Sequence, residues 1–180
     1  MGVGNTPRKN AGQYLLAGLE TGVVGVLAML AWLGAAAIWT QHSFWSPANL
    51  LASTFYGAPA LDNRFTVHTF SGLSLYLLIY GSLGMLFGLA IQERGPSLRI
   101  VCIGILAAIG WYYLAFGLLW RHWNPLVVLY TQDRPMFAGH VLYGLVLGRY
   151  PANLRGLLSK TQTVTVAGDA GIDTSVDAAR

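Results

Sequence analysis

Charge is what this chain has least of. Of its 180 residues 10% are charged, whereas an average soluble domain carries about 25%. Hydrophobic residues make up 54% of the chain, and its mean hydropathy is +0.51. A charge deficit of this size over a single-domain length indicates that the solvent of the folded chain is lipid rather than water. We therefore predict an integral membrane protein whose first partner is the lipid bilayer.

Clustered basic residues and paired cysteines are absent as well. The net charge of +4 comes from Lys and Arg that stand singly or in pairs between apolar runs. This spacing is typical of membrane topology signals and argues against a nucleic-acid partner. The single cysteine, Cys102, excludes an internal disulfide and paired-cysteine redox chemistry. No Walker, Gly-x-Ser-x-Gly or His-Glu-x-x-His motif occurs, which argues against the common enzyme classes. No cofactor is predicted.

Long apolar runs define the predicted fold. A spanning helix needs about 20 predominantly apolar residues, and the runs 14–39, 70–91 and 100–120 meet that requirement. The first is also too long for the hydrophobic segment of a signal peptide, so we expect it to remain as an anchor. With a shorter fourth run over 135–149, the sequence predicts an all-α bundle of four transmembrane helices within residues 12–150.

The fourth run is the weakest of these. A short span, a re-entrant helix and a buried helix at membrane depth are three alternatives for it. Its flanks favour a span, since Arg134 precedes it and Arg149 follows it. At 1.5 Å per residue a helix of this length rises roughly 20 Å, which is enough for a thin or locally pinched membrane.

The distribution of Lys and Arg predicts the orientation. Cytoplasmic segments carry an excess of basic residues, and alternating assignment places seven on one side and three on the other. The seven are Arg8, Lys9, Arg94, Arg99, Arg149, Arg155 and Lys160, and the three are Arg64, Arg121 and Arg134. We therefore expect the N-terminal segment 1–11 and the tail 151–180 in the cytoplasm, beneath a bacterial-type inner membrane. The tail is polar and lacks periodicity, which predicts that it is largely disordered.

The segment 44–60 on the opposite side is too apolar for an ordinary loop and too interrupted to span. Ser46 and Pro47 form a plausible helix start, because proline suits the first turn. We predict a short interfacial helix here, with its aromatic side chains at headgroup depth.

Glu20 and His140 are the candidate ligand- or proton-binding residues, together with Tyr143. Glu20 lies roughly 13 Å beyond the expected inner edge of the first helix, and His140 lies at a similar depth in an oppositely directed helix. A carboxylate–imidazole pair at that depth would pass a proton or hold a ligand. The alternative is a neutral Glu20 bonded to a helix neighbour, with His140 and Tyr143 as packing residues.

Small residues mark helix faces that can approach closely. The candidate packing positions are Gly18, Gly22, Gly25, Gly84, Gly88, Gly144 and Gly148. Glu20 projects from nearly the opposite side of its helix, so the first helix would have neighbours on two sides, one of which could be another protomer. Three histidines near the outer interface are weak metal candidates, because no Asp, Glu or Cys spacing accompanies them. They are His42, His68 and His122.

Three segments resemble a loose group of uncharacterised bacterial four-helix integral membrane proteins. They are the Gly-rich stretch 17–25, the Trp/Pro-Asn-Leu segment 45–52 and the ending His-x-x-Tyr-Gly-x-x-x-Gly over 140–148. The resemblance implies a fold and a compartment, and it implies no reaction.

Three functions are compatible with these features. An accessory or scaffold subunit, or a homo-oligomer, acting by helix association within a membrane complex is favoured by the glycine faces and the missing catalytic motifs. A small proton-linked transporter or channel would use Glu20 and His140. A membrane redox or enzyme subunit is the third alternative.

Overall fold

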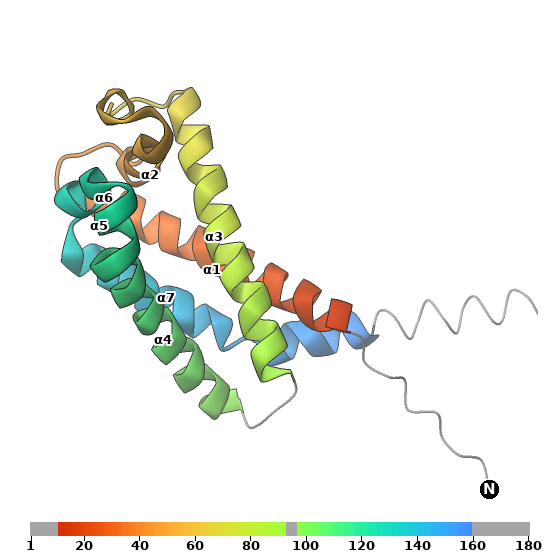
Figure 1. The fold of residues 1–180 in the computed structure, drawn as a ribbon. Coiled ribbons are helices and arrows are strands. Elements are labelled where there is room, and N and C mark those ends of the chain that lie inside the picture. The colour runs from red at the N-terminus through yellow and green to blue at the C-terminus, as the bar shows by residue number, and fades with distance from the viewer. Residues whose placement is uncertain (1–10, 93–96, 160–180) are drawn as a thin grey trace, which may run out of the picture.

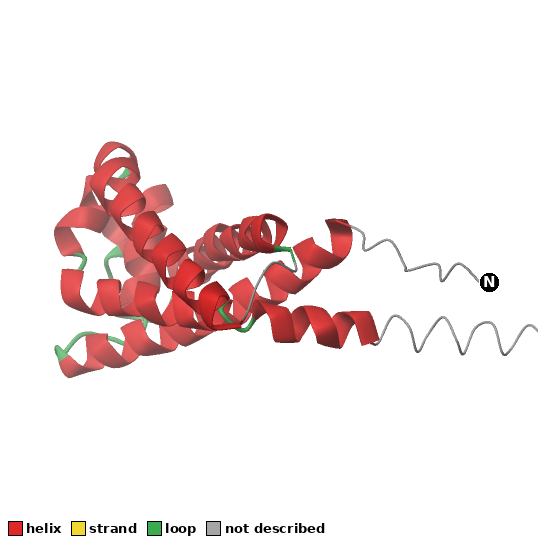
Figure 2. Ribbon diagram, turned by 90° about the horizontal axis from the view of Figure 1, so that it is seen from below, coloured by secondary structure: helices red, strands yellow, loops and turns green. Residues whose placement is uncertain are grey.

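The computed structural model describes residues 11–92 and 97–159, and this part of the chain is helical, without a strand (Figures 1 and 2). The predicted all-α class is therefore confirmed. The elements in chain order are α1 (Ala11–Trp39), α2 (Ser46–Tyr56), the 3-10 turn η1 (Ala58–Ala60), α3 (Val67–Ile91), α4 (Ser97–Leu114), the π-helical turn η2 (Ala115–Leu119), α5 (Trp120–Trp123), α6 (Pro125–Tyr130) and α7 (Asp133–Leu147). A last helical stretch covers 150–159.

Three helices of the described chain are long and apolar enough to cross a membrane. They are Ala11–Trp39, Val67–Ile91 and Leu98–Trp123, the last running through α4, η2 and α5. Each contains one of the three long runs predicted from the sequence. The fourth predicted run forms α7, whose 15 residues rise about 22 Å at 1.5 Å per residue. That length leaves α7 outside the set of membrane-spanning candidates.

The helical part of the chain extends beyond the predicted boundary at residue 150. Residues 150–159 are helical where irregular chain was expected, while 160–180 lie outside the described residues. The reason is an apolar stripe that packs on the bundle, with Tyr150 and Leu154 buried. The Tyr150 hydroxyl donates to the carbonyl oxygen of Gly88 at 3.1 Å, and the Asn153 amide donates to Thr21 Oγ1 at 2.9 Å. The stretch is thereby fixed to α3 and to the start of α1.

Glycine allows the long helices to cross at close range. A Cβ on Gly22 of α1 would come within 2.8 Å of the Tyr80 carbonyl oxygen of α3, and one on Gly144 of α7 within 2.6 Å of the Ile105 Cα of α4. Real Cβ atoms do not approach backbone atoms so closely, so these crossings require glycine. Gly18, Gly25, Gly84, Gly88 and Gly148 also meet atoms of a neighbouring helix. The glycine faces are therefore occupied within the chain.

Asn49 organises the end of the bundle where α2 lies. Proline in the first turn starts α2 at Ser46, as the sequence predicted. Asn49 is 1% exposed, and its amide donates to the carbonyl oxygens of Asp62 and Arg64, the latter at 2.9 Å. Its Oδ1 accepts from the Thr69 hydroxyl at 2.6 Å. One buried side chain thus ties α2, the following connection and α3 together.

Candidate functional site

His140 lies at the centre of the bundle and is fully buried. Its Nδ1 is 2.8 Å from the Met136 carbonyl oxygen, and its Nε2 is 2.9 Å from the Tyr80 hydroxyl. A carbonyl oxygen only accepts, so Nδ1 carries the proton and Nε2 of the neutral ring accepts from Tyr80. Both ring nitrogens of His140 are therefore used inside the bundle.

Aromatic rings enclose this histidine. The rings of Tyr112 and Phe116 meet it edge-on, with centroids at 5.1 Å and 6.2 Å. Tyr80 also accepts at its backbone oxygen from the Tyr143 hydroxyl, at 2.6 Å. A void of about 20 Å³ beside Tyr80 has room for about one water molecule. The cluster links α3, α4 and α7 by packing and by satisfied hydrogen bonds.

Glu20 does not meet His140, so the carboxylate–imidazole pair, one of the two hypotheses for these residues, is not formed. Consecutive residues of an α-helix are about 100° apart, so Glu20 points about 200° away from Gly18. Because Gly18 and Gly22 face α3, the carboxylate is directed outward, and Glu20 is exposed. No described residue forms a hydrogen bond or ion pair with it. A transport path built on Glu20 and His140 therefore lacks its central pair.

The sequence left open whether Tyr143 binds a ligand or packs between helices. It is 1% exposed, and its ring carbons would be 2.8 Å from a Cβ on Gly25. With its hydroxyl already bonded to α3, Tyr143 joins α1, α3 and α7 rather than offering a free phenol. Tyr80, whose carbonyl oxygen accepts from Tyr143, was not predicted as a polar partner. A tyrosine on an apolar helix face beside glycines is typical of helix packing.

The three histidines proposed for a metal are held apart by local contacts. His42 Nδ1 bonds to the Thr40 carbonyl oxygen at 2.9 Å, and His122 Nδ1 bonds to that of Leu118 at 2.8 Å. The ring of His68 lies 4.5 Å from that of Tyr56. Within residues 11–92 and 97–159, no three His, Cys, Asp or Glu side chains group as metal ligands. These weak metal candidates therefore do not form a metal-binding group in the described chain.

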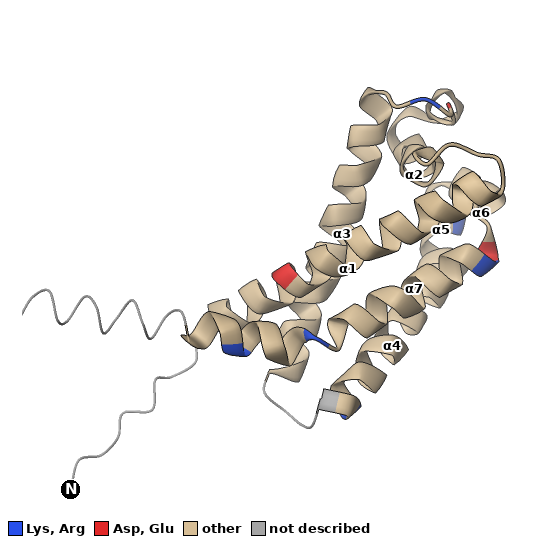
Figure 3. Ribbon diagram, turned by 180° about the vertical axis from the view of Figure 1, so that it is seen from behind, with Lys and Arg blue, Asp and Glu red and all other residues tan. Residues whose placement is uncertain are grey.

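The outward side of α1 is the remaining candidate for function. Leu16, Glu20, Val24 and Leu27 follow one another at intervals of three or four residues, and we call this stripe the Glu20 face. Its three apolar members are 54%, 50% and 54% exposed. The acidic position that Figure 3 marks on α1 is Glu20, the acidic residue of that helix, and its side chain is exposed. A lone carboxylate among exposed aliphatic side chains can bind a cation or a hydrogen-bond donor.

No protein-family model matches the chain, and neither a curated protein nor a solved structure matches it significantly.

Proposed function

We propose that the protein is a small membrane subunit that acts by lateral association and that the Glu20 face of α1 is its contact surface. One observation carries the proposal: a carboxylate is exposed on a helix long and apolar enough to cross a membrane. A charge at the centre of a spanning helix costs on the order of 2.5–3.5 kcal/mol on insertion scales. Glu20 lies about 14 Å along the axis from the first residue of α1. A facing helix that supplies a cation or a donor would offset this cost.

The glycine stripes do not serve association between chains, because they are occupied within this one. Gly22 meets α3 and Gly25 meets Tyr143 of α7. The opposite side of α1 is left for an outside partner, and that is the side that carries the charge. The same geometry that buries the glycines therefore supports association through the Glu20 face.

The chemistry of the face favours a different protein over a second copy. In a symmetric pair of parallel α1 helices, Glu20 would face its own copy, and two carboxylates at close range cannot both ionise without repulsion. A helix with Lys, Arg or His at the matching depth forms a charge-assisted pair instead. The proposed partner is therefore a membrane helix of another protein with a basic residue.

In the proposed arrangement α7 is a short fourth crossing, both ends of the chain lie in the cytoplasm, and the membrane is a bacterial inner membrane. The excess of Lys and Arg on the side of the two ends supports this orientation. At the opposite end α2 would lie along the interface. Exposed aromatic side chains support that depth, since Trp39 is 90% and Phe55 62% exposed, and such rings favour the headgroup region.

The test is to purify the tagged full-length chain from its native membrane in mild detergent and to weigh the particles by native mass spectrometry. We expect a complex with a second membrane protein. Glu20→Ala should release that protein, and Glu20→Gln should weaken the complex, because it keeps the shape and loses the charge. Leu106→Ala is the matched control, since Leu106 of α4 is 68% exposed and lies outside the Glu20 face.

A lone monomer would contradict the proposal, and so would a complex that survives Glu20→Ala. A dimer of this chain that Glu20→Ala dissociates would keep the surface and overturn the basic partner.

A further inference from the structure

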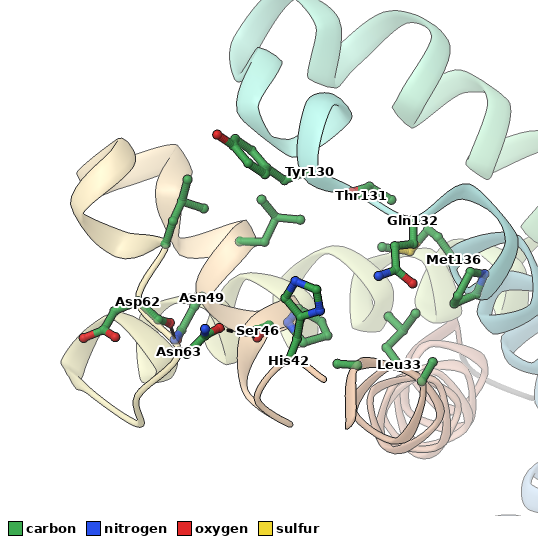
Figure 4. A pocket seen from close by; sticks show the side chains of 16 residues that line it. Leu33, His42, Ser46, Asn49, Asp62, Asn63, Tyr130, Thr131, Gln132 and Met136 are labelled. Carbon is green, nitrogen blue, oxygen red and sulfur yellow. Dashed lines mark hydrogen bonds between the residues drawn. The ribbon is translucent and has the colours of Figure 1, made fainter. Parts of the chain in front are cut away.

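A pocket of about 430 Å³ opens at the end of the bundle where α1 and α6 end and α7 begins (Figure 4). We call it the α2-end pocket, since α2 forms one of its sides. Small-molecule sites in proteins measure about 300–1,000 Å³ and combine an apolar wall with a few polar groups. Here Leu33, Ala36, Leu50 and Met136 are among the apolar lining residues. The size and the wall are those of a ligand site.

A helix ending places His42 in this pocket. The His42 amide donates to the Ala37 carbonyl oxygen at 2.9 Å and the Gln41 amide to that of Ile38 at 3.0 Å. These two bonds form a Schellman motif, whose left-handed position is usually glycine. Gln41 occupies it with φ 61°, a conformation that side chains disfavour. The turn carries His42 to the middle of the pocket, between Ser46 and Gln132 (Figure 4).

Thr40 orients the two polar groups that face a ligand. Its carbonyl oxygen accepts a hydrogen bond from Nδ1–H of His42 at 2.9 Å. In this tautomer Nε2 is the acceptor of the ring. Nε2 has no partner among the described residues. The Thr40 hydroxyl accepts from Nε2 of Gln132 at 3.1 Å, which uses one of the two protons of that amide. An acceptor and a donor are thus held by one threonine.

The opposite side of the pocket is held by hydrogen bonds, and it offers a ligand no charged side chain. Ser46 donates to Asn63 Oδ1 at 3.1 Å, and the Asn49 amide donates to the carbonyl oxygen of Asp62 in the connection between α2 and α3. No Lys or Arg of the described chain lines the pocket, and Asp62 is its one charged lining residue. Figure 4 shows the Asp62 carboxylate turned away from His42, and this carboxylate accepts from the Arg64 amide at 3.2 Å.

We infer that the α2-end pocket binds the hydroxyl group of an uncharged lipid alcohol. A hydroxyl donates one proton and accepts others. It can therefore donate to Nε2 of His42 and accept from the free amide proton of Gln132 at the same time, while the chain lies against Leu33 and Met136. At this end of the bundle α1 ends and α3 begins, so a lipid can enter from the membrane interface.

Other lipid headgroups match the pocket less well. An ester or a quinone carbonyl accepts but does not donate, so it would form no hydrogen bond with the acceptor Nε2 of His42. A carboxylate or a phosphate would enter a pocket without a lining Lys or Arg and would lose its hydration. The hydroxyl is the headgroup that satisfies both His42 and Gln132.

The test measures saturable binding of tritiated lipids to the full-length protein in phosphatidylcholine nanodiscs. Oleyl alcohol and monooleoylglycerol present a hydroxyl from two sources, whereas methyl oleate and oleate carry the same chain without a neutral hydroxyl. We expect both alcohols to bind and the ester and the acid to bind about tenfold more weakly, the loss that 1.4 kcal/mol produces. Comparing the two alcohols distinguishes a simple lipid alcohol from an acylglycerol.

Two sets of variants, each with its control, test the residues. His42→Ala and Gln132→Leu should each weaken alcohol binding about tenfold, whereas His122→Ala should not, because exposed His122 lies outside the pocket. Ala36→Phe should abolish binding by filling the space, with Ala35→Phe on the exposed side of α1 as its control. Thermal unfolding shows that each variant is folded.

Equal binding of methyl oleate or oleate overturns the inference. The absence of saturable binding, or unchanged binding in both His42→Ala and Gln132→Leu, also overturns it.

Discussion

At the scale of single residues, the buried polar side chains of this bundle connect its helices by hydrogen bonds. His140, Tyr80 and Tyr143 form a chain of hydrogen bonds in which every ring nitrogen and hydroxyl has a partner. At the α2 end, the hydrogen bonds of Asn49 likewise connect α2 to the following connection and to α3. Satisfied polar groups in an apolar interior favour one arrangement over its competitors, because any shift leaves a donor or an acceptor unpaired.

The first residue-scale prediction concerns His140. His140→Ala removes a fully buried ring and leaves the Tyr80 hydroxyl without its acceptor. The cavity and the unpaired group together should lower the free energy of unfolding by about 3 kcal/mol. Unfolding in a graded mixture of mild detergent and SDS measures the change. His122→Ala, at an exposed position, should stay within about 0.5 kcal/mol of the parent. Equal stability of the two variants would contradict the structural role of His140.

At the scale of elements, the crossings of α1 with α3 and of α4 with α7 determine the shape of the bundle. Both depend on small residues rather than on interlocking large side chains, because lipid offers no hydrophobic drive for helices to associate. Tight backbone approach then supplies the dispersion contacts that hold the helices together. A glycine at a crossing and a glycine on a free face should therefore respond to substitution in opposite ways.

That contrast gives a matched experiment on two glycines. A Cβ on Gly144 would come within 2.6 Å of the Ile105 Cα, whereas one on Gly110 of α4 meets nothing within 4 Å. Gly144→Ala should force the helices apart and lower the free energy of unfolding by about 1–3 kcal/mol. Gly110→Ala should be neutral or raise it by up to about 1 kcal/mol, because alanine is the better helix former. The same unfolding assay measures both, and a Gly144→Ala protein as stable as the parent would show that this crossing is loose.

The elements also show what the sequence could and could not predict. Apolar length alone identified the three long helices, since a spanning run of about 20 residues has few alternatives in lipid. The expected depths of Glu20 and His140 along their helices are similar, which allowed a contact between them that the structure does not form. Height along a helix says nothing about direction around it, and direction is decided by which face carries Gly18 and Gly22. The α2-end pocket was missed because His42, Asn49 and Gln132 come from three separate segments without a shared motif.

At the scale of the whole molecule, the first and the last segments that the structure describes lie at the same end of the bundle. The described chain starts at α1 and finishes with 150–159, and the two segments lie side by side (Figure 1), joined by the bond from Asn153 to Thr21. The α2-end pocket lies at the other end of α1. Apart from the acidic position on α1, Figure 3 shows most basic and acidic positions near the ends of helices and in the connections between them. This distribution is what a bilayer requires of a protein that crosses it.

Whether α7 crosses the membrane decides the parity of the whole topology. With four crossings residues 6 and 159 lie on one side and residue 58 on the other, whereas with three crossings residues 6 and 159 are separated. Single cysteines at Thr6, Ser159 and Ala58, each in a Cys102→Ala background, report this when a membrane-impermeant maleimide is applied to sealed cells. We expect Ala58→Cys to react from outside, and Thr6→Cys and Ser159→Cys to react only after the membrane is opened. The reason is the hydrogen bond from Asn153 to Thr21, which joins 150–159 to the N-terminal half of α1. Labelling of Ser159→Cys in intact cells, with Thr6→Cys protected, would make α7 a re-entrant or buried helix and leave three crossings.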